Sequence, residues 1–401
     1  IICMIMISIL LLGGCGTKIS HKSPEAVVKS LISAYQNQDE EAVKKAFGVN
    51  PDKKCAKEIQ KEIDYNMDYF KAHEADKVEF RKSKSLGKFD KYELVYVWYD
   101  YKVKKQKETL EVPAMSFYYV KKKDKKYYVV PAKDVNEKMS ENSRKEYSEF
   151  MKGDVYQEYD KAYQTFIRII LMVAYNILLV PVMWFKLCYY ARHVEKYTEE
   201  ERYKMLRFID SRAIKGGRIT IDVHGQENIP KEDGFMFFPN HQGLFDVLAI
   251  MHACPRPFSV VMKKEVQNIP FLKQVFACMK AYAIDRDDVR QSMQVILQVA
   301  KEVKEGRNYL IFPEGTRTKD PNNVHDFKGG SFKSATKAKC PIVPIALIDS
   351  YKSFDTKSIE RVTVQVHILK PMLYEEYKDM KTVEIAAEVK SRIEKVIKEN
   401  E

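Results

Sequence analysis

The chain has 401 residues and a hydrophobic content of 45%, which is enough for two or three domains with cores of their own. Its 68 Lys and Arg residues outnumber 56 Asp and Glu, and the net charge of +12 suits an anionic membrane surface, nucleic acid or acidic ligands. The sequence has no zinc-type Cys/His spacing, arginine-rich arm or nucleic-acid fold signature, so neither a nucleic-acid partner nor a metal site is predicted.

The first 19 residues are predicted to be a targeting segment rather than part of a fold. The run IICMIMISILLLGGC is apolar and ends in two glycines and Cys15. It resembles the lipobox of bacterial lipoproteins, in which small residues admit a peptidase and the Cys thiol receives the lipid. We therefore predict a lipoprotein-type signal at residues 1–19 and lipidation at Cys15. A plain membrane anchor with an incidental Cys is the alternative.

Residues 20–152 are predicted to form a small α+β domain. Ser23 and Pro24 are typical of a helix N-cap and first helical position, and two more helices are predicted at 40–47 and 52–73. Aromatic-rich segments with period-two alternation follow at 92–103, 109–120 and 126–130. Helices followed by such a sheet resemble the small cone-shaped domains of bacterial lipoproteins, which implies a spacer or a ligand-binding module outside the cell.

Residues 166–190, FIRIILMVAYNILLVPVMWFKLCYY, are predicted to be a membrane helix. The stretch 169–185 has no charged residue, which is near the lower limit for a span, and Asn176 and Pro181 weaken it. Basic residues follow directly, at Lys186, Arg192 and Lys196. Because the preceding stretch is acidic, this bias places the following domain on the cytoplasmic face and the N-terminal domain outside. A half-inserted or buried helix is the alternative.

Residues 191–401 alternate between strand and helix patterns. The strand candidates are 218–225, 234–240, 258–264, 281–286, 308–315, 341–347 and 361–369. The clearest helix is predicted at 287–306, where an apolar stripe recurs at helical spacing before a C-terminal glycine. Such alternation predicts an α/β fold with a mainly parallel sheet of about seven strands flanked by helices.

Polar clusters follow three of these strands, at the point where each strand ends. They are Asn240-His241, Asp285-Arg286 and the run PEGTR at 313–317. Because ligands of α/β sheets bind at the carboxyl ends of the strands, the three clusters are expected to form one site.

His241 and Asp246 have the residue types of a general base and a carboxylate that orients it. A loop His and a helix-capping carboxylate would show the same spacing, so the pair by itself leaves both interpretations open. His325 beside Asp326 is the nearest rival pair, but it lies in a polar loop. No G-x-S-x-G nucleophile elbow occurs in the chain.

Four sequence blocks, NHQGLFD, AIDRDD, FPEGTRT and VPIAL, occur in an order that resembles the glycerolipid acyltransferase family, most closely the bacterial 1-acyl-sn-glycerol-3-phosphate acyltransferases. The likeness covers residues 166–401 and leaves out the N-terminal domain. Gly243 departs from the family, many members of which carry Ser at this position. The resemblance implies a membrane-bound enzyme of the 1-acylglycerol-3-phosphate O-acyltransferase type. His241 would be the base that activates the acceptor hydroxyl, and Asp246 would hold its other ring nitrogen.

The same resemblance implies an acceptor site for lysophosphatidic acid. Arg317 would bind the phosphate, Gly315 and Thr316 would bring backbone amides close to it, and Glu314 would orient the loop or the glycerol hydroxyl. Arg286 is a second candidate phosphate ligand, unless it pairs with a neighbouring Asp. Two lysines after the third strand are further candidates for the phosphate or the membrane, Lys263 and Lys264.

The expected reaction transfers an acyl chain from a thioester of coenzyme A or acyl carrier protein to lysophosphatidic acid, and gives phosphatidic acid in phospholipid biosynthesis. No other cofactor is expected, and the expected partners are these substrates and membrane phospholipid. The expected location is a bacterial cell membrane. An acyltransferase acting on another lysophospholipid, or a non-catalytic lipid-binding surface lipoprotein, is the alternative.

Overall fold

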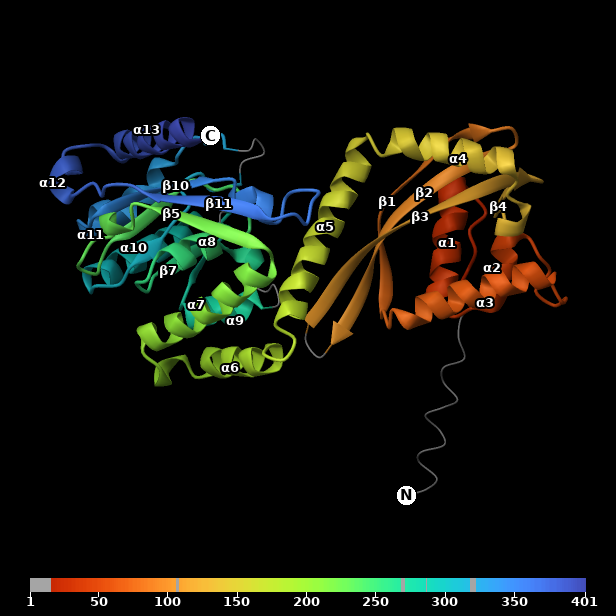
Figure 1. Ribbon diagram of the computed structural model, residues 1–401, viewed down its shortest axis with the longest axis horizontal. Helices are drawn as coiled ribbons and strands as arrows, with labels where there is room; N and C mark the ends of the chain where they lie inside the picture. The colour runs from red at the N-terminus through yellow and green to blue at the C-terminus, as the bar shows by residue number, and fades with distance from the viewer. Residues whose placement is uncertain (1–15, 106–107, 268–270, 286, 318–321) are drawn as a thin grey trace, which may run out of the picture. The chain divides into compact units, whose positions relative to one another are not determined.

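The computed structural model describes residues 16–105, 108–267, 271–285, 287–317 and 322–401. The predicted lipidation site, Cys15, and most of the predicted signal lie outside the described residues. The chain divides into two compact units, Ile1–Tyr163 and Gln164–Glu401, which are described separately (Figure 1).

Unit 1 begins with helices and continues as an antiparallel sheet. The helices are α1 (Pro24–Gln36), α2 (Glu40–Phe47) and α3 (Lys57–Ala72), followed after the sheet by α4 (Glu137–Phe150). The strands are β1 (Lys77–Phe89), β2 (Tyr92–Lys105), β3 (Glu108–Lys123) and β4 (Lys126–Val129), paired in that order. The predicted helix start is confirmed, since Ser23 accepts a hydrogen bond from the backbone of Ala26 at 3.1 Å.

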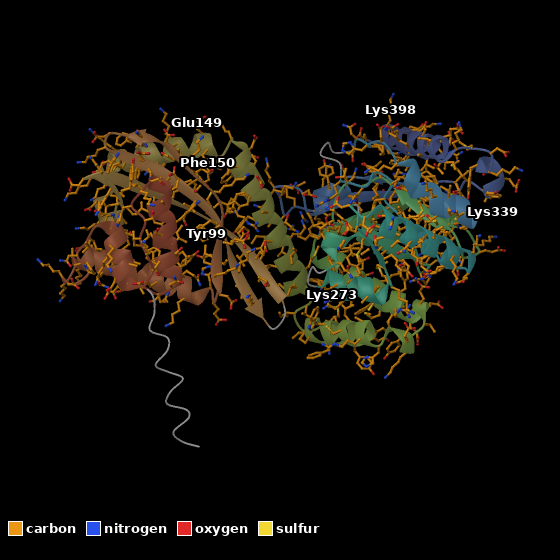
Figure 2. The ribbon with its side chains drawn as sticks, turned by 180° about the vertical axis from the view of Figure 1, so that it is seen from behind. Tyr99, Glu149, Phe150, Lys273, Lys339 and Lys398 are labelled. Carbon is orange, nitrogen blue, oxygen red and sulfur yellow. The ribbon has the colours of Figure 1, made fainter. Side chains whose placement is uncertain are left out.

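The sheet of unit 1 is covered by helices on both faces. Val95 and Tyr99 of β2 pack with α1 in one apolar cluster, whereas Tyr96, on the opposite face, lies 4.5 Å from the ring of Phe150 of α4 (Figure 2). Strand β1 was not predicted from the sequence. It is an edge strand with five Lys or Arg residues, and its pairing with β2 rather than an apolar pattern holds it in place.

The segment predicted to be one membrane helix is broken in the structure. It contributes to α5 (Asp154–Tyr175) and α6 (Val180–Arg192), which are bent by 98° at the break between them. Among the described residues, no single helix has both the length and the apolarity to cross a membrane, although this bent pair meets the criterion together. The segment 166–190 therefore forms two helices instead of the single one predicted, and the predicted membrane span is not confirmed.

The break has a local cause in the two residues that weakened the prediction. Asn176 directly follows the last residue of α5. Its side-chain amide donates to the carbonyls of Met172 and Arg212, at 2.8 and 3.0 Å, and its side-chain oxygen accepts from Arg212 Nε at 2.7 Å. Pro181 lies in the first turn of α6, where its missing N–H is tolerated. Because Arg212 belongs to α7 (Glu199–Gly216), these contacts fix the bend against the rest of unit 2.

Unit 2 is built around a seven-stranded sheet within the described residues. In chain order its strands are β5 (Ile219–His224), β6 (Met236–Pro239), β7 (Ser259–Lys263), β8 (Tyr282–Ile284), β9 (Tyr309–Leu310), β10 (Ile342–Ile348) and β11 (Val362–Ile368). The spatial order is β5-β11-β10-β6-β9-β7-β8, and β10 with β11 is the one antiparallel pair in this part of the chain. The predicted mainly parallel α/β sheet is confirmed.

Helices cover both faces of this sheet, so its strands are apolar on both sides. One face packs against α7, α8 (Asp246–Ala253) and α9 (Leu272–Cys278). The other face packs against α10 (Val289–Lys304), α11 (Lys333–Ala338) and α13 (Thr382–Asn400). Strand β6 shows the alternation, since Phe237 belongs to the first cluster and Phe238 to the second. This two-sided burial fixes where β6 ends and where the following loop starts.

Asp210 of α7 is buried, with 3% of its surface exposed, and neither carboxyl oxygen has a hydrogen-bond partner among the described residues. Loss of hydration raises the pKa of Asp210 well above its ordinary value, although Arg207 opposes the shift. Because the folded state then holds its proton more tightly, stability falls as the pH rises above the unfolded pKa of about 3.9. We expect Asp210→Asn to raise the melting temperature at pH 8 by about 2 °C or more.

Calorimetry at pH 4 and pH 8 measures this effect, with Asp379→Asn, at an exposed position, as the control. Near pH 4 the difference in melting temperature should be much smaller, because the carboxyl is neutral in the folded state and only about half ionised in the unfolded state. An equal shift at both pH values would contradict the ionisation of Asp210 as the cause.

Candidate active site

The carboxyl ends of β6 and β9 place two of the predicted clusters side by side. His241 follows β6 by two residues, and Glu314 lies in the loop after β9. The Glu314 carboxylate accepts a hydrogen bond from the backbone N–H of His241 at 2.7 Å. The ring of His241 stacks on Phe312, which precedes Glu314, with ring centroids 4.1 Å apart. The structure therefore brings the NHQGLFD and FPEGTRT blocks together, as parallel neighbouring strands require.

His241 and Asp246 form a direct hydrogen bond. The distance from His241 Nδ1 to Asp246 Oδ2 is 2.7 Å. Asp246 is the first residue of α8 and is fully buried, whereas 22% of the His241 side chain is exposed. Because Nδ1 is occupied by the carboxylate, Nε2 is the ring nitrogen left to contact a substrate.

Several donors surround the Asp246 carboxylate. Oδ2 also accepts from the backbone N–H groups of Gln242 and Gly243, at 2.7 and 3.0 Å. Oδ1 accepts from the Ser350 hydroxyl at 2.6 Å. A carboxylate at the N-terminus of a helix is further stabilised by the helix dipole. Asp246 therefore holds the His241 ring and the backbone of the loop before α8 at once, whereas the N-cap position of α8 is taken by Phe245 and not by this carboxylate.

Asn240 and Gln242 lie on either side of His241 in the loop between β6 and α8, and no role was predicted for their side chains. Asn240 donates to the carbonyl of Leu347 at 3.0 Å and accepts from its N–H at 2.7 Å, so it extends the pairing of β6 with β10. Gln242 accepts from the backbone N–H of Ser350 at 2.8 Å and donates to Asn322 Oδ1 at 2.7 Å. Both side chains are buried, so these bonds are shielded from water.

Glu314 faces the protein backbone rather than a substrate. Its two oxygens accept from the backbone N–H groups of His241, at 2.7 Å, and His325, at 3.3 Å. Its surface is 2% exposed, and this burial, with a contribution from Asp246, raises the pKa of Glu314 to about 7. Of the two roles expected for Glu314, these contacts support orientation of the loop.

His241 lines a cavity of about 660 Å³, whose lining contains a group of apolar side chains, called the apolar end, and a group of basic side chains, called the cationic end. The apolar end lies between α8, β7, α9 and α10, and its lining consists mainly of Leu244, Val247, Leu248, Met251, Val260, Met262, Val266, Leu272, Val275, Phe276, Ile284, Met293 and Ile296. This lining suits a hydrocarbon chain, because apolar surface removed from water contributes about 25 cal/mol per Å².

The cationic end contains the predicted Arg317 and two lysines that were not predicted from the sequence. Arg317 lines it together with Lys328 and Lys333, and none of the three forms an ion pair with a described residue. Gly315 has a φ of +71°, and a Cβ there would lie 3.1 Å from Lys328 Nζ, so a glycine is needed for this close approach. The run FKGGSFK, with two lysines around two glycines, was the available signal for Lys328 and Lys333.

The remaining predicted residues lie elsewhere or outside the described residues. Thr316 lines the cavity beside Arg317, and Lys263 lines it while paired with Glu265 at 2.7 Å. Lys264 is not part of the lining, and pairs with Asp285 at 3.0 Å. Arg286 lies outside the described residues, so neither of its two expected roles is assigned to it.

The rival pair and other polar groups do not form a comparable site. Asp326 pairs with Lys390 at 2.7 Å and not with His325, the side chain of which is exposed. In the part of the chain that the structure describes, no group of three or more His, Cys, Asp or Glu residues could hold a metal ion.

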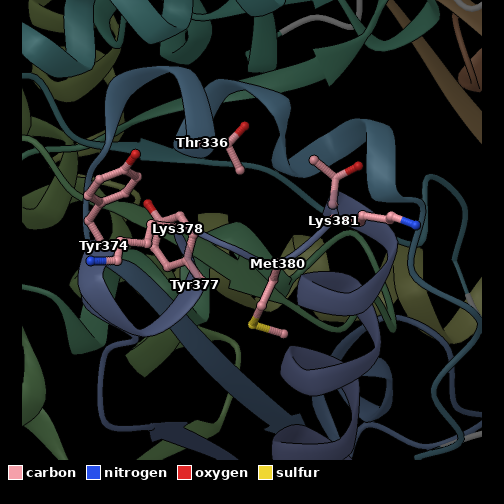
Figure 3. Close-up of a pocket in the computed structure, with 7 residues that line it drawn as sticks. Thr336, Tyr374, Tyr377, Lys378, Met380 and Lys381 are labelled. Carbon is pink, nitrogen blue, oxygen red and sulfur yellow. The ribbon is translucent and has the colours of Figure 1, made fainter.

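Another cavity, of about 400 Å³, lies beside α11, α12 (Tyr374–Tyr377) and the start of α13 (Figure 3). Its lining is Thr336, Tyr374, Tyr377, Lys378, Met380, Lys381 and Thr382. This set contains no His, Cys or carboxylate, and Lys378 pairs with Glu375 at 2.6 Å. The lining therefore lacks the acid–base pair that His241 and Asp246 provide.

Residues 220–348 match the family model described as Acyltransferase. Among curated proteins, the chain is 32% identical over 150 residues to 1-acyl-sn-glycerol-3-phosphate acyltransferase of Borreliella burgdorferi, covering 37% of this chain and 60% of that protein. It is 29% identical over 185 residues to the protein of that name from Saccharomyces cerevisiae, covering 45% of this chain and 61% of the relative. The match to the Salmonella typhimurium protein of the same name is 28% over 165 residues, with 41% and 67% covered.

Among solved structures, the chain is similar to the 1-acyl-sn-glycerophosphate acyltransferase PlsC of Thermotoga maritima, with a TM-score of 0.48 and 22% identity over 59% of this chain and 97% of that one. The chain spans about three fifths of the length of the first two curated relatives. These sequence matches support the predicted enzyme class, an acyltransferase of the 1-acylglycerol-3-phosphate O-acyltransferase type. The resemblance drawn from the four sequence blocks is thus confirmed for residues 220–348, which match the acyltransferase family model.

Proposed function

We propose that unit 2 transfers an acyl chain from an acyl thioester to the free hydroxyl of 1-acyl-glycerol-3-phosphate and so produces phosphatidic acid. The observation that carries this proposal is the position of His241. It lines a single cavity together with a large group of apolar side chains and with the basic residues Arg317, Lys328 and Lys333, and Asp246 leaves Nε2 as its free ring nitrogen. A lysophosphatidic acid molecule has the same division, with a hydrocarbon chain and a phosphate on either side of its hydroxyl.

The proposed chemistry is a direct attack on the thioester. His241 Nε2 takes the proton of the acceptor hydroxyl while its oxygen attacks the thioester carbonyl carbon. Asp246 stabilises the imidazolium that forms, through the 2.7 Å bond to Nδ1. When the tetrahedral intermediate collapses, the C–S bond breaks and the thiolate leaves with the proton that His241 returns. The products are an ester and a free thiol, so atoms and charges balance.

An acyl-enzyme is not required by this arrangement. Burial raises the pKa of the Cys254 thiol to about 11 and those of Cys278 and Cys340 to about 12, so these thiols stay protonated and weakly nucleophilic near neutral pH. No serine hydroxyl forms a hydrogen bond with His241 among the described residues. The acceptor hydroxyl is therefore the nucleophile that the base can activate.

The acceptor phosphate fits the cationic end of the cavity. Arg317 offers a guanidinium that can bind two phosphate oxygens at once, and Lys328 and Lys333 add positive charge nearby. The names of the curated relatives refer to a 1-acyl-glycerol-3-phosphate acceptor, which supports the same assignment. Coenzyme A or acyl carrier protein would supply the thioester, and a panel of lysolipids with both donors distinguishes this reaction from acylation of another lysophospholipid.

We also propose that the bent pair α5–α6 attaches the enzyme to the membrane. It leaves large apolar side chains exposed to solvent, among them Ile177 (62%), Leu178 (88%), Val182 (63%) and Phe185 (74%). A contiguous apolar surface of this kind is typical of a membrane contact. Acyl thioesters are made in the cytoplasm, so unit 2 would work on the cytoplasmic face, and lipidation at Cys15 would hold unit 1 outside.

Replacement of the base is expected to remove turnover. His241→Ala should lower the rate of transfer to lysophosphatidic acid by about 10² to 10⁴, the usual contribution of a general base. Asp246→Asn should also be severe, because the imidazole loses its orienting charge. Transfer of a radiolabelled acyl chain measures both effects. His325→Ala is the control, because only the backbone of His325 contacts Glu314, and near-wild-type transfer by His241→Ala would rule out the direct attack.

Arg317→Ala is expected to raise the Michaelis constant for lysophosphatidic acid far more than that for the thioester. Loss of one charge-assisted contact to phosphate costs about 1.5–3 kcal/mol. Steady-state kinetics with each substrate varied in turn measures the difference. Lys337→Ala, on the same unit but outside the cavity lining, is the control. Equal effects on both substrates would assign Arg317 a structural role.

The proposed arrangement across the membrane is testable with an impermeant thiol reagent on intact cells. Single cysteines are placed at Ser148 in unit 1 and at Lys357 in unit 2, both exposed positions, after replacement of every native Cys except Cys15. Labelling of position 148 alone supports an outer unit 1 and a cytoplasmic unit 2. Labelling at both positions, or at neither, means that α5 and α6 enter and leave the membrane on the same side.

A further inference from the structure

The two oxygens of the Asp246 carboxylate have different partners. Oδ2 is held by the His241 ring and by two backbone N–H groups of the loop that follows β6. Oδ1 instead accepts from Ser350 Oγ at 2.6 Å, and Ser350 comes from the end of β10, 104 residues later in the chain. Ser350 is fully buried, so water does not compete for this bond.

Hydrogen bonds to the loop that follows β6 hold Ser350 in place. Asp349, just before it, has a φ of +62°, and this left-handed turn starts the short helix Ser350–Ser353. The N–H of Ser350 donates to Gln242 Oε1 at 2.8 Å, and the N–H of Asp349 donates to Asn322 Oδ1 at 3.1 Å. Asn322 Oδ1 also accepts from Gln242 Nε2 at 2.7 Å. These bonds fix the backbone of Ser350, and thereby the position from which its hydroxyl donates to Asp246.

We propose that Ser350 is a positioning residue of acyl transfer, whose hydroxyl fixes the plane of the Asp246 carboxylate and thereby the direction of His241 Nε2. The expected effect on kcat rests on the proposed function. The expected effect on the orientation of Asp246 and His241 rests on the geometry alone. With both oxygens held, the carboxylate cannot turn about its Cβ–Cγ bond. Without the hydroxyl, a buried oxygen loses the partner that the described residues give it, and the carboxylate is free to turn away from Nδ1.

Ser353 supplies a matched comparison within the same short helix. Its side chain is 1% exposed, as buried as that of Ser350, but its hydroxyl has no hydrogen-bond partner among the described residues. Replacing either serine with alanine removes one buried hydroxyl from the same element. The two variants therefore differ in the bond to Asp246 and not in the volume removed.

The kinetic test uses the full chain with a lysolipid acceptor. Ser350→Ala should lower kcat about 10- to 100-fold, as loss of a hydrogen bond to a charged group implies, with both Michaelis constants changed by no more than about twofold. Ser350→Thr, which keeps the hydroxyl, should recover most of this loss, and Ser353→Ala should behave as the wild type. An unchanged kcat for Ser350→Ala, or an equal loss for Ser353→Ala, would overturn the proposal.

A second measurement does not depend on activity. In proton NMR of the full chain labelled with ¹⁵N-histidine, the His241 Nδ1 proton bound to the carboxylate should give a strongly deshielded resonance that His241→Ala removes. Ser350→Ala should shift or abolish it, and Ser353→Ala should retain it. If the wild type acylates no lysolipid, the proposed function fails while this resonance still tests Ser350. A resonance that Ser350→Ala leaves unchanged would refute the positioning role.

Discussion

The candidate site depends on keeping one negative charge, the Asp246 carboxylate, inside the protein with none of its surface exposed. A buried charge without partners costs several kcal/mol, so its donors are a condition of the fold as well as of the chemistry. They come from the loop after β6 and from Ser350 after β10, two neighbouring strands that are distant in sequence. The His–Asp pair can therefore form only after this part of the sheet has assembled.

The apolar segment 166–190 contributes some side chains to the core of unit 2 and leaves others at the surface. Hydropathy alone cannot distinguish the two groups. Arg168, near the start of the segment, is 1% exposed and donates to the carbonyls of Gly217, Ser358 and Glu360 at 2.6–3.1 Å. Asn176 is bound to Arg212 in the same way at the break. These contacts hold α5 against unit 2 by its polar groups, so that apolar side chains around the break remain available for a membrane.

The sequence was sufficient where the controlling interactions are local or periodic. Six of the seven strands of unit 2 lie within the predicted segments, and β10 extends one residue beyond its segment. The polar clusters that follow β6 and β9 meet because parallel strands end at the same edge. It was insufficient where a distant partner decides the structure. The role of Ser350 cannot be predicted from its neighbours in the sequence, because β10 brings it to Asp246. Strand β1 cannot be predicted from its lysine-rich sequence, because its pairing with β2 makes it a strand. The bend at Asn176 likewise needs Arg212, 36 residues away.

The loop after β9 connects the two halves of the proposed chemistry. Glu314 holds the backbone of His241, and three residues later the same loop presents Arg317 to the cavity. Because Gly315 lies between them with a φ of +71°, the loop turns sharply and Lys328 approaches it closely. One short loop thereby contains both the carboxylate that holds the backbone of His241 and one of the basic residues that line the cavity. Burial raises the pKa of Glu314 to about 7, so its carboxylate gains a proton as the pH falls through neutrality. The protonated oxygen is then a poorer acceptor for the backbone N–H group that it holds.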